Sequence, residues 1–100
     1  MRAIRIRLAD RDPLNGGVVP EVFRDGSLVF FFYSDEGFEP PHVHVRRGSG
    51  NVDAEGKWWL TPISCSFCKG FKAGERRRIE FLIRTRRQEI LDAWNQHFGT

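Results

Sequence analysis

The sequence predicts an α+β domain, in which a small, mostly antiparallel sheet has a long C-terminal amphipathic helix packed on one face. Ile4, Ile6 and Leu8 alternate with polar or small residues, which is typical of a half-buried strand. The dipeptide Asp25-Gly26 separates two apolar segments and indicates a tight hairpin. From residue 75 onward, apolar residues recur at steps of three and four, as on one face of a long helix, at Ile79, Leu82, Ile83, Ile90, Leu91, Trp94 and Phe98.

The composition indicates one compact domain, since the chain has 100 residues of which 40% are hydrophobic. We divide it into an N-terminal strand-like extension and loop, residues 1–18, and a single domain, residues 19–100. No apolar stretch is long enough for a signal peptide or a membrane span, so we expect a cytoplasmic protein without a membrane partner. The net charge of +3 and the arginines at 76–78 and 84–87 favour an anionic partner, although solvated helix faces explain them slightly better.

The middle of the chain predicts a series of strands. Leu28–Tyr33 is apolar on both faces and should be a central, covered strand. A four-residue loop at 48–51 then joins the next two strands and sets three pairs opposite each other: Arg46 with Asp53, Val45 with Ala54 and His44 with Glu55. Trp58 and Leu60 continue the inward set, whereas Lys57 and Trp59 share the outer face. Residues 63–71 are expected to form a short helix that ends at Gly70.

The segment Glu39–Val45 is the most informative part of the sequence, because it places His42 and His44 two residues apart after a proline pair. In an extended strand, residues i and i+2 point to the same face, so both imidazoles can reach one ligand. Val43 and Val45 then point the other way, toward a core. Since the helix covers only one side of the sheet, we expect the histidine side to stay at least partly open.

Five segments carry a family resemblance, namely Phe30–Ser34, Glu39–Val45, Lys57–Pro62, Gly70-Phe71 and Ile90–Phe98. In order and spacing they resemble the small bacterial proteins grouped as domain of unknown function 4160, over about four fifths of the chain from Val19 onward. The resemblance implies a stand-alone cytoplasmic protein, commonly encoded beside another small protein and suspected of belonging to a toxin–antitoxin-type pair. It implies no catalytic residues. The chain departs from the family pattern at Thr61, usually acidic, and at Cys65 and Cys68, where cysteines are not typical.

Three hypotheses compete for His42 and His44. In the first, they bind zinc together with Cys65 and Cys68, because four donors of these types suit a structural zinc site. Apart from this zinc, the sequence requires no cofactor. In the second, the two imidazoles are the catalytic acid and base of a small ribonuclease-like or metal-dependent enzyme, and a neighbouring arginine holds the anion.

In the third hypothesis, the histidine face is a recognition surface made by His42, His44, Arg46, Trp59 and Glu55. A basic face with an exposed aromatic ring suits a protein partner or single-stranded nucleic acid. We favour a noncatalytic recognition component of a toxin–antitoxin-like or regulatory pair, with a small protein as partner and nucleic acid as a second candidate. The enzyme centred on His42 and His44 stays the alternative, so the sequence leaves open whether the chain is an enzyme.

Overall fold

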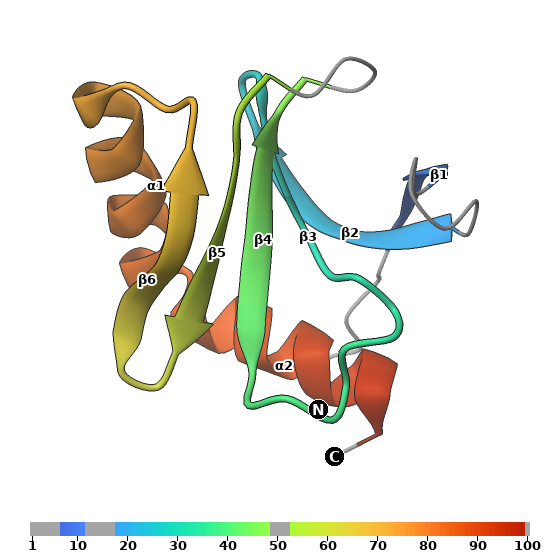
Figure 1. Cartoon of the computed structure of the whole chain (residues 1–100). Coiled ribbons are helices and arrows are strands. Elements are labelled where there is room, and N and C mark those ends of the chain that lie inside the picture. The colour runs from blue at the N-terminus through green and yellow to red at the C-terminus, as the bar shows by residue number, and fades with distance from the viewer. Residues whose placement is uncertain (1–6, 12–17, 49–52, 100) are drawn as a thin grey trace.

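The computed structural model describes residues 7–11, 18–48 and 53–99, which form one sheet and two helices (Figure 1). The strands are β1 (Arg7–Arg11), β2 (Val18–Asp25), β3 (Leu28–Phe31), β4 (His42–Arg47), β5 (Glu55–Leu60) and β6 (Ile63–Lys69), and the helices are α1 (Ala73–Thr85) and α2 (Arg87–Phe98). Each strand pairs antiparallel with the next in the chain, so the sheet order is β1-β2-β3-β4-β5-β6. The predicted α+β fold with an antiparallel sheet is confirmed.

Both helices lie on the same face of the sheet, behind it in Figure 1. The core between these layers is built from buried apolar side chains of both, among them Phe30, Val43, Val45, Trp58, Leu60, Ile79, Ile83, Ile90 and Trp94. The valines of β4 therefore face the helices, as the alternation of the sequence predicts. The histidines of β4 consequently project from the opposite face of the sheet.

The hairpin at Asp25-Gly26 is confirmed, since β2 pairs with β3 and Gly26 has a φ of 59°. All four residues of β3 are buried, as expected for a covered strand. In the N-terminal extension, Leu8 lies in β1 and pairs with Pro20 of β2, so this part of the extension joins the same sheet. The predicted strand positions 4 and 6 and most of the predicted loop, residues 12–17, lie outside the described residues.

The predicted pairing of β4 with β5 is wrong by two residues. The structure pairs Arg46 with Glu55, Val45 with Gly56 and His44 with Lys57. Position 56 has no room for a side chain, because the indole of Trp58 occupies the space that it would need. A shift of two residues keeps every side chain on its predicted face. The tip of the expected loop, residues 49–51, lies outside the described residues.

The helix predicted for residues 63–71 is wrong, because this segment forms β6 and pairs with β5 through a tight turn at Thr61-Pro62. Strand β5 would otherwise have an unpaired edge, and pairing satisfies its backbone groups. Lys57 pairs with Phe67 and Trp58 with Cys65, so Ser66 is an extra residue on β6 and forms a bulge. Gly70 has a φ of 83° and follows a strand, not a helix.

The predicted single C-terminal helix is two helices, because Arg86 leaves the helical conformation with φ −113° and ψ 22°. The apolar stripe is interrupted at this point by Arg86 and Arg87. The guanidinium of Arg86 lies 3.6 Å from the ring centroid of Phe23, and Arg87 Nε donates a hydrogen bond to the Leu60 carbonyl at 2.7 Å. These contacts hold the break between the helices against the sheet. Among the described residues, neither helix is long and apolar enough to cross a membrane.

Candidate functional site

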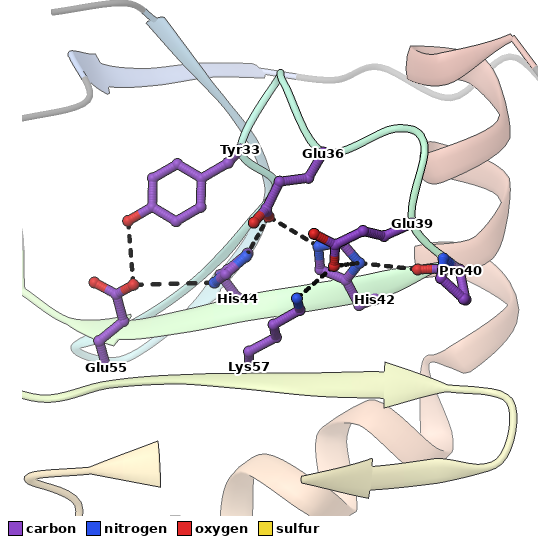
Figure 2. Close-up of polar contacts among 8 residues, drawn as sticks. All are labelled: Tyr33, Glu36, Glu39, Pro40, His42, His44, Glu55 and Lys57. Carbon is purple, nitrogen blue, oxygen red and sulfur yellow. Dashed lines mark hydrogen bonds and ion pairs between the residues drawn. The ribbon is translucent and has the colours of Figure 1, made fainter. Parts of the chain in front are cut away.

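Residues 32–41 join β3 to β4, and we call them the covering segment. It begins at Phe32, which packs against Trp94 of α2, and then passes over the histidines of β4. Figure 2 shows the Glu36 carboxylate of this segment pointing toward the imidazoles of β4. Two successive turns position it, since the Glu36 N–H donates to the Tyr33 carbonyl at 3.2 Å and the Glu39 N–H donates to the Glu36 carbonyl at 3.1 Å. Gly37 packs against Phe98 so closely that a side chain there would overlap the ring, which holds the segment near α2.

One carboxylate oxygen contacts both histidines. Glu36 Oε1 lies 2.9 Å from His42 Nε2 and 2.6 Å from His44 Nε2 (Figure 2). The prediction that the two imidazoles project from one face is therefore confirmed. Sequence reasoning missed Glu36, although it is one of three acidic residues in the predicted connection that precedes the histidine strand.

The expectation of a partly open histidine face holds for its edge but not for the histidines themselves. On this face Phe67 is 44% exposed, and Lys57 and Trp59 are partly accessible. His42 is 0% exposed, and His44 and Arg46 are each 3% exposed.

The covering segment lies over the histidines, and α2 adds to the enclosure because the Trp94 ring lies 4.9 Å from the His42 ring. The Arg46 guanidinium lies 5.0 Å from the ring centroid of Phe31. The structure places the five predicted binding residues on one face of the sheet. Trp59 and Glu55 are partly accessible there, whereas His42, His44 and Arg46 are buried.

The hydrogen-bond partners determine which ring nitrogens of the two histidines carry hydrogen. His42 Nδ1 lies 2.9 Å from the Pro40 carbonyl oxygen, which can only accept, so Nδ1 carries the hydrogen. The other ring nitrogen of His42, Nε2, contacts Glu36 Oε1. In neutral His44 the hydrogen is on Nε2 and is donated to Glu36, which leaves Nδ1 buried without a hydrogen-bond partner among the described residues. The nearest carboxylate oxygen to that Nδ1 is Glu55 Oε2, at 3.9 Å.

Burial and charge determine the protonation of the cluster. Burial lowers the pKa of His44 to about 4, although the hydrogen bond to Glu36 acts in the opposite direction. Burial raises the pKa of Glu36, but hydrogen bonds from His42 and His44 and their electrostatic attraction outweigh it, so this pKa is lowered. At neutral pH the centre of the cluster is thus a carboxylate next to an uncharged His44.

A second group of charges surrounds the histidines. Lys57 Nζ lies 2.5 Å from Glu39 Oε1, and the Tyr33 hydroxyl donates to Glu55 Oε2 at 3.1 Å (Figure 2). The site is therefore polar, and its carboxylates and cations are connected by hydrogen bonds and ion pairs.

A comparison with protein families decides the affiliation of the chain. The model described as Domain of unknown function (DUF4160) matches residues 27–95. The chain belongs to the DUF4160 family. The match includes the covering segment, both histidines of β4 and most of α2, whereas β1 and β2 precede it. Comparisons with curated proteins and with solved structures give no significant match.

In this DUF4160 protein the two cysteines do not join the histidines. Cys65 and Cys68 both pack against the core on the helix side of the sheet, because the bulge at Ser66 turns residues three apart to the same face. His42 and His44 project from the other side, so the four-donor zinc site suggested by the sequence is not assembled. Burial also raises the pKa of the Cys68 thiol, which disfavours the thiolate that zinc binds.

An apolar pocket lies beside the polar cluster of the DUF4160 fold. It has a volume of about 250 Å³ and is lined by Pro40, Pro41, Trp59, Thr61, Pro62 and Ser64; we call it the Pro–Trp pocket. Trp59 connects the two features, because its ring lies 5.5 Å from the His42 ring and 4.5 Å from Lys57 Nζ. The covering segment contributes both the carboxylate of the cluster and the proline wall of the pocket.

Proposed function

We propose that this DUF4160 protein is a noncatalytic recognition component of a toxin–antitoxin-like or regulatory pair, and that it binds a small protein partner at the Pro–Trp pocket. The observation that carries the proposal is the pocket itself, an apolar hollow bordered by the covering segment. In the same segment, the Phe38 side chain is 85% exposed. Exposed aromatic residues near apolar hollows are characteristic of protein interaction surfaces.

The size of the pocket favours a protein anchor over a small-molecule ligand. Sites for drug-sized molecules usually occupy about 300–1,000 Å³, whereas this pocket has about 250 Å³. That volume suits one or two apolar side chains of a partner. The Trp59 ring packs against His42 and Lys57, which restrict its motion. The side chain therefore loses little conformational freedom when a partner binds.

Burial of the two histidines argues against catalysis by them. A general acid or base has to lie within hydrogen-bond reach of the group that it protonates or deprotonates. A substrate could reach His42 Nε2 or His44 Nε2 only after displacing Glu36, which already contacts both nitrogens. We therefore assign recognition to Trp59 and the prolines of the Pro–Trp pocket. His42 packs against the Trp59 ring and helps to position it.

The test is binding of the purified chain to a small protein encoded beside it, such as the family resemblance implies, measured by calorimetry. Trp59→Ala removes the wall of the pocket, and Ser64→Arg fills its opening from an exposed position on β6. Each variant should weaken binding about tenfold or more, since truncating an anchor commonly costs over about 1 kcal/mol. Phe81→Ser is the matched control, because Phe81 is an exposed aromatic residue on α1 outside the pocket, and its variant should bind normally.

Two results would overturn the proposal. The first is unchanged partner binding by folded Ser64→Arg protein. The second is cleavage of RNA by the purified chain that disappears on His42→Ala, which would establish the enzyme alternative. Expression in cells with and without the neighbouring gene adds a third readout, since a regulatory pair requires the growth effect of one protein to depend on the other.

A further inference from the structure

We propose that Glu36, His42 and His44 form a binding site for one divalent transition-metal ion, with Zn²⁺ as the simplest occupant. Their donor atoms all lie within 4.8 Å of one another, and Figure 2 shows them converging from the covering segment and β4. Two imidazoles and one carboxylate are ligands that first-row divalent metals accept readily. This inference goes beyond the proposed function and does not depend on it.

The contacts of the far ring nitrogens support the site. A metal-bound histidine usually donates its other N–H to a carbonyl or carboxylate, which orients the ring. His42 already does so through Nδ1 to the Pro40 carbonyl, and its Nε2 points at the Glu36 carboxylate. A metal ion between Nε2 and that carboxylate would therefore find the His42 ring already oriented by its outer contact.

His44 Nδ1 supplies an independent indication. A buried nitrogen without a hydrogen-bond partner is unfavourable, and His44 Nδ1 has none among the described residues. If a metal takes Nε2, the hydrogen moves to Nδ1, which faces Glu55 Oε2 at 3.9 Å. The same Glu55 oxygen accepts the Tyr33 hydroxyl hydrogen, so the carboxylate is held in place for this second contact. Both histidines would then have the outer acceptor that metal ligands usually have.

The charge and dimensions of the cluster are compatible with an ion. Glu36 places a carboxylate oxygen against both imidazoles, and a divalent ion would be attracted to this oxygen despite the nearby Lys57. Zinc bonds of about 2.0–2.2 Å in a tetrahedral arrangement place donor atoms roughly 3.4 Å apart. The present separations are 2.6 and 2.9 Å, so Glu36 would have to withdraw by less than roughly 1 Å.

The experiment uses the full chain without a histidine tag, treated with EDTA and then titrated with ZnCl₂ by calorimetry. We expect one Zn²⁺ per chain. Glu36→Gln, which keeps the shape but removes the carboxylate, and His44→Ala should each weaken binding by at least about tenfold. The double variant Cys65→Ser/Cys68→Ser is the matched control and should bind like the wild type, as should His97→Gln, which alters a histidine outside the cluster.

A second measurement on the unaltered protein guards against variants that fail to fold. With CoCl₂ in place of ZnCl₂, ligand-field absorption without a thiolate-to-cobalt charge-transfer band supports nitrogen and oxygen ligands. The proposal is overturned if folded wild-type protein binds no stoichiometric Zn²⁺ or Co²⁺, if binding survives both Glu36→Gln and His44→Ala, or if the cysteine double variant abolishes it. Because partner binding is a separate assay, each of the two proposals can fail while the other stands.

Discussion

His44 illustrates how neighbouring side chains change the chemistry of a single residue. Its ring is enclosed by the rings of Tyr33 at 4.5 Å, His42 at 5.2 Å and Phe31 at 5.5 Å between centroids. This surrounding disfavours the imidazolium, so burial lowers the pKa of His44 from 6.5 to about 4. The residue that looks in the sequence like an accessible acid–base group is therefore neutral and enclosed in the folded protein.

The lowered pKa predicts that the metal-free protein loses stability as the pH falls from about 6.5 to about 4. In that interval the unfolded chain takes up a proton at His44 while the folded protein does not, so acid favours unfolding. The charged and titratable groups facing this ring are Glu36, Glu55, Lys57 and His42. Urea unfolding in EDTA at about pH 7 and about pH 5 should differ by roughly 2 kcal/mol from this group alone.

His44→Gln is the control for this prediction, because glutamine does not titrate. The variant should be less stable at neutral pH but should lose less stability on acidification than the wild type. Glu36, whose pKa is also lowered, contributes a further loss below its unfolded value of 4.5, outside the His44 interval. Equal pH dependence of variant and wild type between about pH 7 and pH 5 would contradict the assignment to His44.

At the scale of the secondary-structure elements, two glycines with positive φ lie in connections. Gly26 joins β2 to β3 and Gly70 joins β6 to α1, and the two differ in the space around them. Gly26 has a φ of 59° and no atom within 4 Å of the position of an added Cβ. Gly70, with a φ of 83°, would place a Cβ against the Asp53 carbonyl oxygen and Ala54. Both positions disfavour other residues through their backbone conformation, but only Gly70 also lacks space.

Gly26→Ala should therefore lower the free energy of unfolding by about 1 kcal/mol, the usual cost of a left-handed conformation for alanine. Gly70→Ala should lower it by about 3 kcal/mol, because the overlap with rigid backbone atoms adds to that cost. Denaturant unfolding of the two variants side by side measures the difference. Equal destabilisation would show that the Asp53–Gly70 approach is relaxed in solution.

Element types were predictable where a periodic pattern was long and unbroken. The alternation around Val43 and Val45 correctly indicates a strand and its faces, and Asp25-Gly26 correctly indicates a hairpin. Two predictions failed for identifiable reasons. The strand β6 has a bulge at Ser66, which spoils its alternation and imitates a helical spacing between Cys65 and Cys68. The helix break lies at Arg86, where Arg86 and Arg87 interrupt the series of apolar residues. We missed this interruption because the apolar residues before and after it continue the spacing of three and four.

At the scale of the whole molecule, one core joins the sheet to both helices. Ile79 and Ile83 of α1 and Ile90 and Trp94 of α2 pack against the same inner sheet face. Such a shared core couples the elements, so the described part of the chain should unfold in a single cooperative transition. Tryptophan fluorescence and far-UV circular dichroism should accordingly report the same denaturation midpoint.

Ile90→Ala tests this coupling. Ile90 is fully buried, so the variant should lower the free energy of unfolding by about 2–5 kcal/mol while the transition stays single. Gln96→Ala on the exposed side of the same helix should change it by less than about 0.5 kcal/mol. Separate transitions for fluorescence and circular dichroism in Ile90→Ala would mean that α2 unfolds independently of the sheet.

The sequence by itself determined the fold class, the hairpin, the alternation of β4 and the placement of both imidazoles on one face. These features depend on local periodicity and turn chemistry, which neighbouring residues carry. Only the tertiary structure decided that the two histidines are buried, that Glu36 contacts both rings and that Cys65 and Cys68 lie on the other side of the sheet. The return path of the covering segment depends on contacts between residues distant in the chain, such as Gly37 with Phe98, and no local pattern encodes them.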